Sequence, residues 1–362
     1  MSTLEAAGAS LTPNELSAPD ELSATDELSA PDELSATDES LTSGQTLDLL
    51  HGPGEAVVCG HTNPDGDALG SNLALAALLR ARGYRVTSLL AQDVPAPELY
   101  GFLEDYTFVP AAAYKGEPDL FVAVDAPNAD RLDDGREVLA RSRHSLCIDH
   151  HPDYDGFADA YFGDSGAAAT GVLIWRLLKD ANITIDKSIA EYCYIALVTD
   201  TGRFAFQNTN AEALVAASEM VSAGVEPSWI NLMVYDQKPM AALQLDARLI
   251  SRIAFADEGR VVYSWVDEAD FIELGLKREE SEGLPSILRS VKGADIAILL
   301  RQEGENTRVN LRAKDICDVG EIARRMGGGG HKAAAGFTLK KPLQTTLDML
   351  LSGTAGLNCY RK

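Results

Sequence analysis

The sequence lacks long apolar runs and closely spaced cysteines. No run approaches the roughly 20 apolar residues that a membrane-spanning helix needs. The acidic N-terminus has neither the basic start nor the apolar core of a signal peptide. The five cysteines, at positions 59, 147, 193, 317 and 359, form no CxxC pair, so we expect buried free thiols and no zinc site. These absences predict a cytoplasmic globular protein, and 362 residues suffice for two domains.

Positive charge is also scarce. The chain has 31 lysines and arginines against 55 acidic residues, which gives a net charge of −24. A protein that coats long or duplex nucleic acid needs a broad basic face, so this charge disfavours that class. It does not exclude a small anionic substrate, because bound metal ions can supply positive charge locally.

The first 50 residues contain no lysine or arginine and 11 acidic residues. Within them, residues 15–39 repeat the hexapeptides ELSAPD and ELSATD. A period of six matches neither an α-helix nor a heptad repeat, and the composition is typical of a solvated chain. We therefore predict a disordered acidic tail over residues 1–44. A tail that binds a partner remains the alternative.

From residue 45 onward, apolar strand-like runs alternate with helix-like runs. This alternation predicts an α/β domain over 45–210 with a mostly parallel sheet flanked by helices. Residues 211–257 are predicted to form a helical connector. A second set of strand patterns predicts a smaller α/β domain over 258–345, followed by a C-terminal tail over 346–362. The strands of the first domain are expected at 56–61, 86–90, 119–126 and 144–150, and those of the second at 260–267, 294–302 and 307–314.

Three of the expected strands end in residues that bind metals. His61 ends the first strand, Asp125 ends another, and the run Asp149-His150-His151 ends a third. Ligands of open α/β sheets bind at the carboxyl ends of the strands, so these groups are predicted to meet in one crevice.

The loop HTNPDGD (61–67) contributes to the same crevice. Pro64 is expected to hold Asn63 extended, and Gly66 to allow a tight reversal that turns Asp65 and Asp67 toward His61. A helix starting near residue 68 would add amides that favour anions, and Asp200 ends a later apolar run. Taken singly, each group has an ordinary alternative as a polar loop, turn or helix cap. Their shared location favours a metal site.

The donor set has carboxylates and imidazoles but no thiolate. It suits Mn²⁺ or Mg²⁺, tolerates Co²⁺, and makes Zn²⁺ possible but less preferred. Six ligands exceed what one ion with bound water and substrate can hold, so two ions with a bridging carboxylate are expected, about 3.5–4 Å apart as in many sites that act on phosphorus. The candidate ligands are His61, Asp65, Asp67, Asp125, His150 and Asp200.

A second unusual stretch is RRMGGGGHKAAAGF (324–337). Its glycines could form a flexible helix end, or a loop whose amides approach a phosphate beside His331 and Lys332. Just upstream, the strand RVNLRAK carries Arg308, Arg312 and Lys314, of which the last two share a face. A solvated strand face is the alternative, but a basic cluster in an acidic protein also suits phosphate.

These motifs resemble a known family. HTNPDGD, the aspartate of VDAPN, DHH and the aspartate of VTDTGRF are similar to the four motifs of the DHH phosphoesterase superfamily, and GGGGHKAAAGF is similar to the signature of the DHHA1 domain. The resemblance covers residues from about 45 to 345. It is greatest to the bifunctional oligoribonucleases and 3′-phosphoadenosine 5′-phosphate phosphatases, or nanoRNases. The acidic tail is not part of this pattern.

The resemblance implies roles for individual residues. His61, Asp65 and Asp125 would hold one Mn²⁺, while Asp67, Asp125, His150 and Asp200 would hold a second. Asp149 would orient an imidazole, and His151 would stabilise or protonate the leaving oxygen. The substrate's far phosphate or terminal nucleotide would bind to Arg312, Lys314, Gly328, Gly329, Gly330 and His331.

The resemblance also implies an activity. The protein would hydrolyse RNA of two to five nucleotides to mononucleotides and 3′-phosphoadenosine 5′-phosphate to AMP, by attack of a hydroxide held by two metals. A phosphodiesterase for cyclic-di-AMP or pApA is the alternative, and a nucleotide-binding protein without catalysis is the third. Neither long duplex nucleic acid nor a membrane is an expected partner, and a homodimer is left open.

Overall fold

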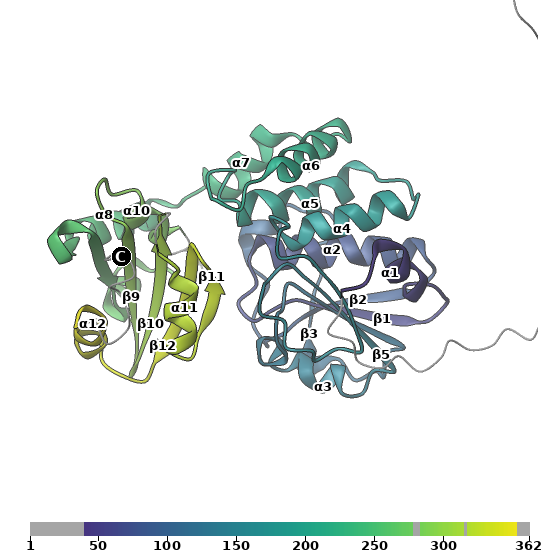
Figure 1. Ribbon diagram of the computed structural model, residues 1–362, viewed down its shortest axis with the longest axis horizontal. Coiled ribbons are helices and arrows are strands. Elements are labelled where there is room, and N and C mark those ends of the chain that lie inside the picture. Colours follow the sequence, from purple (N-terminus) through teal and green to yellow (C-terminus); the bar gives the residue numbers. More distant parts are fainter. Residues whose placement is uncertain (1–39, 278–282, 315–316, 353–362) are drawn as a thin grey trace, which may run out of the picture. The chain divides into compact units, whose positions relative to one another are not determined.

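The computed structural model describes residues 40–277, 283–314 and 317–352 (Figure 1). Nearly all of the expected acidic tail therefore lies outside the described residues. In the described part of the chain, no helix is long and apolar enough to cross a membrane.

The first sheet has six strands, all paired in parallel in the order β3-β2-β1-β4-β5-β6. Parallel sheets are covered on both faces, which explains why the central strand β4, with the sequence LFVAV, is buried at every position. The predicted α/β class with a mostly parallel sheet is confirmed. The strands are β1 (Glu55–Cys59), β2 (Arg85–Leu90), β3 (Val109–Pro110), β4 (Leu120–Val124), β5 (His144–Asp149) and β6 (Ala160–Gly163).

Helices cover both faces of this sheet. On one face, α2, α4 and α5 pack against each other and against the strands, with α1 and α6 at their sides (Figure 1). On the other face, the short helix α3 covers side chains such as Phe121 and Cys147. The helices are α1 (Ser43–Leu49), α2 (Gly66–Ala81), α3 (Gly135–Leu139), α4 (Thr170–Asp180), α5 (Lys187–Asp200) and α6 (Ala211–Ser222).

Glycines let α2, α4 and α5 approach each other closely. A Cβ on Gly70 of α2 would lie 2.3 Å from the carbonyl oxygen of Tyr192 in α5. A Cβ on Gly171 of α4 would lie 2.4 Å from the Cβ of Ala196 in α5. The crossing matters for function because the first residues of α2 and α4 and the last residue of α5 all contribute to the site described below.

We therefore expect Gly70→Ala to lower the free energy of unfolding by about 1–3 kcal/mol, because the new methyl group meets backbone that cannot move alone. Gly44→Ala is the matched control, since a Cβ there has no atom within 4 Å. A glycine-to-alanine change in an open helix position should stabilise by up to about 1 kcal/mol. Urea unfolding of both variants measures the difference, and equal stabilities would contradict the close crossing.

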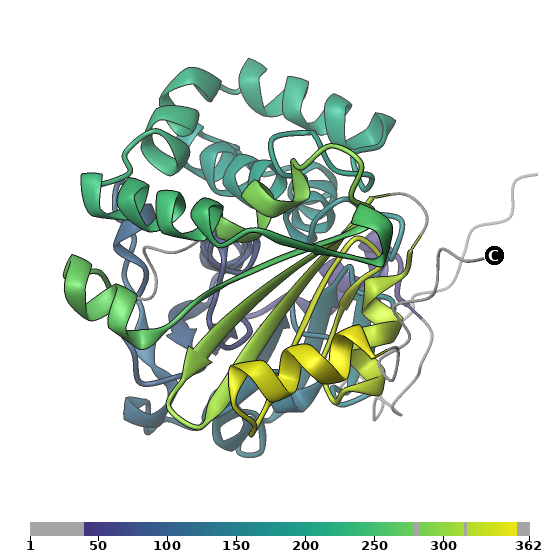
Figure 2. The same cartoon turned by 90° about the vertical axis from the view of Figure 1, so that its left-hand side faces the viewer.

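The second sheet is mixed, with the order β11-β12-β10-β9-β8-β7, and only its β8–β9 pair is parallel among the described pairings. Side chains of α8 and α10 cover one face of it. Helices α11 and α12 cover the other, and the yellow helix α12 crosses the strands in Figure 2. The strands are β7 (Ala254–Ala256), β8 (Val261–Val266), β9 (Ile296–Glu303), β10 (Asn306–Ala313), β11 (Gly329–His331) and β12 (Ala334–Leu339).

The remaining helices complete this second α/β unit and the segment before it. Helix α7 (Pro227–Tyr235) precedes α8 (Met240–Ser251), and α9 (Glu268–Leu274) and α10 (Leu284–Arg289) lie between β8 and β9. Helix α11 (Val319–Arg325) precedes the glycine run. Helix α12 (Leu343–Leu351) buries Leu347 and Leu350 in the core of the second unit. Residues that the sequence assigned to a tail thus pack against the sheet.

The cysteines only partly follow expectation. Cys59, Cys147 and Cys193 are buried free thiols, and burial raises the pKa of each well above its usual range. Cys317 is also buried, but it is disulfide-bonded, so the expectation of a free thiol is wrong at this position.

Candidate metal centre

The loop after β1 differs from the sequence-based expectation in two ways. Asn63 has φ 52°, so it is left-handed and not extended before Pro64. Asparagine tolerates this conformation better than most residues. Gly66 makes no reversal but is the first residue of α2, and a Cβ there would lie 2.5 Å from Oγ1 of Thr199. The glycine therefore serves close packing.

Asp65 is the N-cap of α2. Its Oδ1 accepts hydrogen bonds from the amides of Asp67 and Ala68, at 3.0 and 3.2 Å. This oxygen therefore caps the helix, which is the ordinary alternative that the sequence left open for Asp65. The same oxygen lies 3.8 Å from Nε2 of His61, so the cap also places the carboxylate beside the histidine.

The backbone fixes the orientation of His61. Its Nδ1 lies 2.8 Å from the carbonyl oxygen of Thr62, and with a proton on Nδ1 it donates to that oxygen. The Nε2 then carries a lone pair that faces Oδ2 of Asp125 at 3.4 Å. A backbone acceptor at one imidazole nitrogen is the usual way in which metal-binding histidines are oriented.

Asp125 follows β4 in a left-handed conformation, with φ 55°. Its amide donates to the carbonyl oxygen of Ile148, and Oγ1 of Thr170 donates to its Oδ1 at 3.1 Å. The residue is 2% exposed. Non-glycine residues at positive φ are uncommon and concentrate at functional sites, where the surrounding structure compensates for their strain.

Asp67 caps a helix that begins far away in the sequence. The N-cap position of α4, Ala169, offers no side-chain acceptor. The carboxylate of Asp67 instead accepts from the amides of Thr170 and Gly171, at 2.7 and 2.9 Å, and from Oγ of Ser71 at 2.9 Å. These donors and the helix dipole favour a negative charge at this point.

His150 joins the carboxylates to each other. Its Nδ1 lies 3.2 Å from the carbonyl oxygen of Ala167. Its Nε2 faces Oδ2 of Asp67 at 3.7 Å, Oδ1 of Asp125 at 3.5 Å and Oδ2 of Asp200 at 3.8 Å. The imidazole therefore has the same arrangement as His61, with one nitrogen on the backbone and the other toward the acids.

The ligand atoms form two groups that share one residue. His61, Asp65 and Asp125 make the first group, and Asp67, Asp125 and His150 make the second. Within each group the ligand atoms lie within 4.8 Å of one another. Asp125 belongs to both, which is the arrangement that a bridging carboxylate requires. Asp200 lies beside the second group, next to His150.

The carboxylates crowd each other in a buried place. Burial and the charges of Asp125, Asp200 and Asp65 raise the pKa of Asp67 well above its usual range. Burial and the charges of Asp65 and Asp125 raise the pKa of Asp200 to about 6, against the opposing effect of His150. Burial would also raise the pKa of Asp125, but the adjacent His61 and the positive charge that the neighbouring histidines carry when protonated lower it. The cluster has more negative charge than its protein neighbours neutralise.

Asp149 and His151 form a separate pair beside the cluster. Oδ1 of the fully buried Asp149 lies 2.7 Å from Nδ1 of His151. Burial would lower the pKa of His151, but this hydrogen bond and the charges of Asp149, Asp125 and Asp200 raise it to about 9. Oδ2 of Asp149 is buried without a hydrogen-bond partner. Asp149 thus orients the ring of His151 through Nδ1 and not through Nε2.

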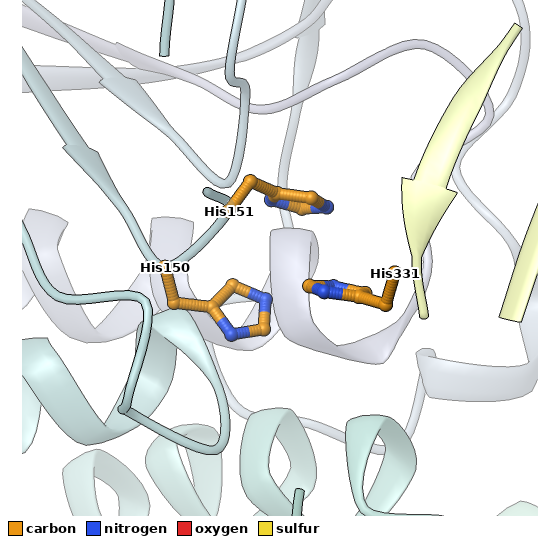
Figure 3. Close-up of side chains that lie close together, drawn as sticks. All are labelled: His150, His151 and His331. Atoms are coloured by element: carbon orange, nitrogen blue, oxygen red, sulfur yellow. The ribbon is translucent and has the colours of Figure 1, made fainter. Parts of the chain in front are cut away.

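His331 lies against this pair of histidines (Figure 3). Its ring stacks on His151, with centroids 4.5 Å apart and planes inclined by 19°, and it lies 4.9 Å from the ring of His150. Burial and the charges of His151 and His150 lower the pKa of His331 to about 3. The end of β11 therefore brings a third imidazole to the site.

The glycine run before His331 is ordered for specific reasons. Gly327 has φ 80° and follows the C-cap of α11, and the amides of Gly327 and Gly328 donate to the carbonyls of Arg324 and Ala323. This is the hydrogen-bond pattern of a Schellman C-cap. A Cβ on Gly330 would lie 2.6 Å from the carbonyl oxygen of Ala334. At the other two glycines, Gly327 and Gly329, a Cβ would have no atom within 4 Å.

Adjacent glycines should respond differently to substitution. A Cβ on Gly328 would lie 2.1 Å from the carbonyl oxygen of Gly336, so Gly328→Ala should lower the melting temperature by several degrees. Gly329→Ala should change it by no more than about 1 °C, because the space there is open. Thermal denaturation of the two variants provides the comparison. A stable Gly328→Ala protein would show that this packing is wrong.

Two basic residues at and just after the end of β10, Arg312 and Lys314, differ in the hydrogen bonds that their side chains already make. Nζ of Lys314 donates to the carbonyl oxygen of Val291 at 2.6 Å. Nη1 of Arg312 donates to the carbonyl oxygen of Leu311 at 3.0 Å, while its Nε is buried without a partner. Burial and the charge of Arg289 lower the pKa of Arg312 to about 10, and Asp200 opposes them. Arg312 therefore retains donors for a ligand, whereas the ammonium of Lys314 is held by backbone.

Models of two known domain families match two separate segments of the chain. The N-terminal domain model of the DHH family matches residues 55–197. Residues 55–197 therefore form a DHH-family N-terminal domain. A model of the DHHA1 domain matches residues 258–352, so the second α/β unit is a DHHA1 domain.

Similar proteins cover both the DHH and the DHHA1 domain. The chain is 27% identical over 282 residues to the bifunctional oligoribonuclease and PAP phosphatase NrnA of Bacillus subtilis, covering 77% of this chain and 87% of that protein. It is 28% identical over 299 residues to the protein of that name from Thermus thermophilus, covering 82% and 87%. An exopolyphosphatase-related protein of Bacteroides fragilis has the same fold, with a TM-score of 0.79, 22% identity and coverage of 88% of this chain and 96% of its own.

Two residues that hydrogen-bond the candidate ligands were not predicted from the sequence. Thr170 contacts both Asp125 and Asp67, through its hydroxyl and its amide. Asn208 donates through Nδ2 to Oδ2 of Asp200 at 3.0 Å. Neither residue type binds metals often, and only the position of Thr170 at the start of a helix pattern was a signal. Their roles could not be predicted because the acidic residues that they contact lie elsewhere in the sequence.

The residues present fit divalent metal ions. Nε2 of His61 and of His150 carry lone pairs toward carboxylate oxygens at 3.4–3.8 Å, which is unfavourable unless a cation or a proton lies between them. Carboxylates with imidazoles and no thiolate suit Mn²⁺ and Mg²⁺. The acidic and histidine cluster of the DHH domain could therefore bind metal.

Proposed function

We propose that the protein is a metal-dependent phosphoesterase that hydrolyses RNA of two to five nucleotides and converts 3′-phosphoadenosine 5′-phosphate to AMP. The observation that carries this proposal is the position of Asp125 in two donor groups of one buried cluster. The similarity to proteins named oligoribonuclease and PAP phosphatase extends over both domains and agrees with it.

We propose that two ions, most simply Mn²⁺, bind here. His61, Asp65 and Asp125 would hold one ion, and Asp67, Asp125, His150 and Asp200 the other. Bound ions of this kind supply Lewis acidity, which lowers the pKa of water and neutralises charge on phosphoryl oxygens. Thr170 and Asn208 fix the orientations of Asp125 and Asp200 for this purpose.

The chain's own residues would position the substrate and move a proton. His151, oriented by Asp149, would donate a proton to the leaving oxygen through Nε2 or stabilise its charge. His331 would hydrogen-bond the substrate from the DHHA1 domain. Gly329 leaves space for a substrate to approach the backbone, and Arg312 provides guanidinium donors for a phosphate away from the scissile bond.

The architecture favours short substrates. Groups that would bind the ions come from the DHH domain, while Arg312 and His331 come from the DHHA1 domain, so a substrate contacting both has a limited length between them. The net charge of −24 also disfavours long polyanions.

A substrate panel tests this proposal. With Mn²⁺ present, the purified full-length protein should hydrolyse a two- to five-nucleotide RNA and 3′-phosphoadenosine 5′-phosphate. A 24-nucleotide RNA should be cleaved at least about ten times more slowly per molecule. Chelation by EDTA should abolish all activity, and added Mn²⁺ should restore it. Ion-exchange chromatography of the products gives the rates.

Cyclic-di-AMP and pApA belong in the same panel, because the sequence leaves a phosphodiesterase for these compounds as the alternative. Turnover of cyclic-di-AMP well above that of the short RNA would replace the proposed substrate class. Mn²⁺-dependent cleavage of none of the compounds would contradict a phosphoesterase of this kind.

A further inference from the structure

We infer that His150, His151 and His331 together form a separate site for a divalent ion that prefers imidazole ligands, of which Zn²⁺ is the representative, and that an ion bound there inhibits hydrolysis. Binding at this site does not depend on the proposed function, whereas inhibition rests on it. Sequence patterns gave the three histidines three different roles and no reason to combine them.

The first observation is that the three imidazoles converge, as Figure 3 shows. Each histidine offers one ring nitrogen, and these three nitrogens lie within 4.8 Å of one another. The ring centroids are 4.5 Å apart for His151 and His331, and 4.8 Å apart for His150 and His151. A tetrahedral zinc ion with Zn–N bonds of about 2.0–2.1 Å needs nitrogens about 3.3 Å apart, so modest ring rotations complete the site.

The second observation is that each ring keeps a nitrogen available. Nδ1 of His150 lies 3.2 Å from the carbonyl oxygen of Ala167, and Nδ1 of His151 lies 2.7 Å from Oδ1 of Asp149. Both rings are thus held through one nitrogen and offer Nε2, which is how proteins usually present imidazole to a metal. In the part of the chain that the structure describes, the ring of His331 makes no hydrogen bond.

The third observation is that the backbone at His331 is fixed while its ring can turn. His331 is paired with Ala334 between β11 and β12, and the carbonyl oxygen of the next residue, Lys332, accepts from the amide of Val319 at 2.9 Å. The χ2 torsion of a histidine has a broad energy minimum, and no hydrogen bond restrains it here. The ring can therefore turn a nitrogen toward His150 and His151.

The donor set selects the kind of ion. A mixture of carboxylates and imidazoles suits Mn²⁺, whereas three imidazoles without a carboxylate suit ions such as Zn²⁺. Three protein nitrogens also leave the fourth tetrahedral position open for water or a phosphate oxygen. Negative charge that attracts a divalent ion comes from Asp149 and Asp125, whose Oδ1 atoms lie 2.7 and 3.6 Å from Nδ1 of His151.

Occupation of this site would conflict with hydrolysis at two points. His150 also belongs to the donor group of Asp67 and Asp125, and its Nε2 cannot serve two ions at once. Nε2 of His151 is the atom proposed to protonate or stabilise the leaving oxygen, and a bound ion would block it. We therefore expect Zn²⁺ to inhibit hydrolysis even when Mn²⁺ is in excess.

A zinc titration of the full-length protein in saturating Mn²⁺, with a chromophoric chelator as competitor, tests the site. His331→Gln is the informative variant because His331 belongs to neither carboxylate group, so exchange of Mn²⁺ for Zn²⁺ in those groups affects both proteins equally. We expect it to weaken the binding of one zinc per chain by at least about tenfold, and to leave the Mn²⁺-induced rise in melting temperature unchanged. His151→Gln should show the same zinc loss. His144→Gln, which changes an exposed histidine at the other end of β5, should match the wild type.

Inhibition is measured as the Zn²⁺ concentration that halves hydrolysis of a short RNA, and it should be at least about ten times higher for His331→Gln. Equal zinc affinities of the wild type and His331→Gln would overturn the site, and so would a parallel loss of Mn²⁺ binding. Weakened zinc binding with unchanged inhibition would overturn the inhibitory role. If the wild type hydrolyses no short RNA, the proposed function fails, and the zinc titration alone decides whether the site exists.

Discussion

Replacing Asp125 with asparagine should lower kcat/KM for phosphoester hydrolysis by at least about 10³-fold, because the substitution removes the charge that both donor groups share. Asparagine is the informative replacement because Asp125 has φ 55°, which asparagine tolerates and alanine does not. The increase in melting temperature that Mn²⁺ gives the wild type should disappear.

The matched control is Asp105→Asn. Asp105 also has a positive φ, of 52°, but its side chain is 72% exposed and pairs only weakly with Arg80, at 4.0 Å. Its substitution should change neither hydrolysis nor the response to Mn²⁺. An Asp125→Asn protein that kept both wild-type turnover and the Mn²⁺-induced stabilisation would show that the metals bind elsewhere.

Replacing His151 with glutamine should lower kcat by about 10²- to 10⁴-fold while metal binding persists, because glutamine keeps much of the side chain's size but cannot transfer a proton. Asp149→Asn should lower kcat less, since the imidazole remains but loses the acceptor that orients it. If the two residues act as one unit, the double variant should be no slower than His151→Gln alone.

His144→Gln is the control for this series. His144 is the exposed first residue of β5, at the opposite end of the strand that delivers His151. Its substitution should leave kcat unchanged. Additive losses in the Asp149 and His151 variants would contradict the positioning role of Asp149, and undiminished kcat in His151→Gln would contradict the role of His151 itself.

Much of the fold, and the convergence of the candidate ligand residues, could be predicted because both depend on local patterns. Apolar runs alternating with amphipathic runs predict a parallel sheet, and in such a sheet the carboxyl ends of the strands meet. His61, Asp125 and His150 follow three neighbouring strands, β1, β4 and β5, so the topology alone brings them together. Asp65 and Asp67 follow from the adjacent loop.

What could not be predicted depends on contacts between distant segments. The sequence assigned Gly66 to a turn. A glycine is needed there because a Cβ would collide with the side chain of Thr199, on a helix more than a hundred residues later. Asn63 adopts a left-handed conformation that Pro64 disfavours, because tertiary structure overrides the local preference.

The cap that Asp67 provides for α4 has a consequence for evolution. A lineage that no longer needed catalysis would be free to lose His61 and Asp125, since their contacts serve mainly the cluster itself. Asp67 would still be needed to start α4, because its carboxylate accepts two amides there and Ala169 cannot. Retention of Asp67 in a homologue would therefore not by itself indicate that activity is kept, whereas loss of Asp125 would indicate its absence if Asp125 holds the ions as proposed.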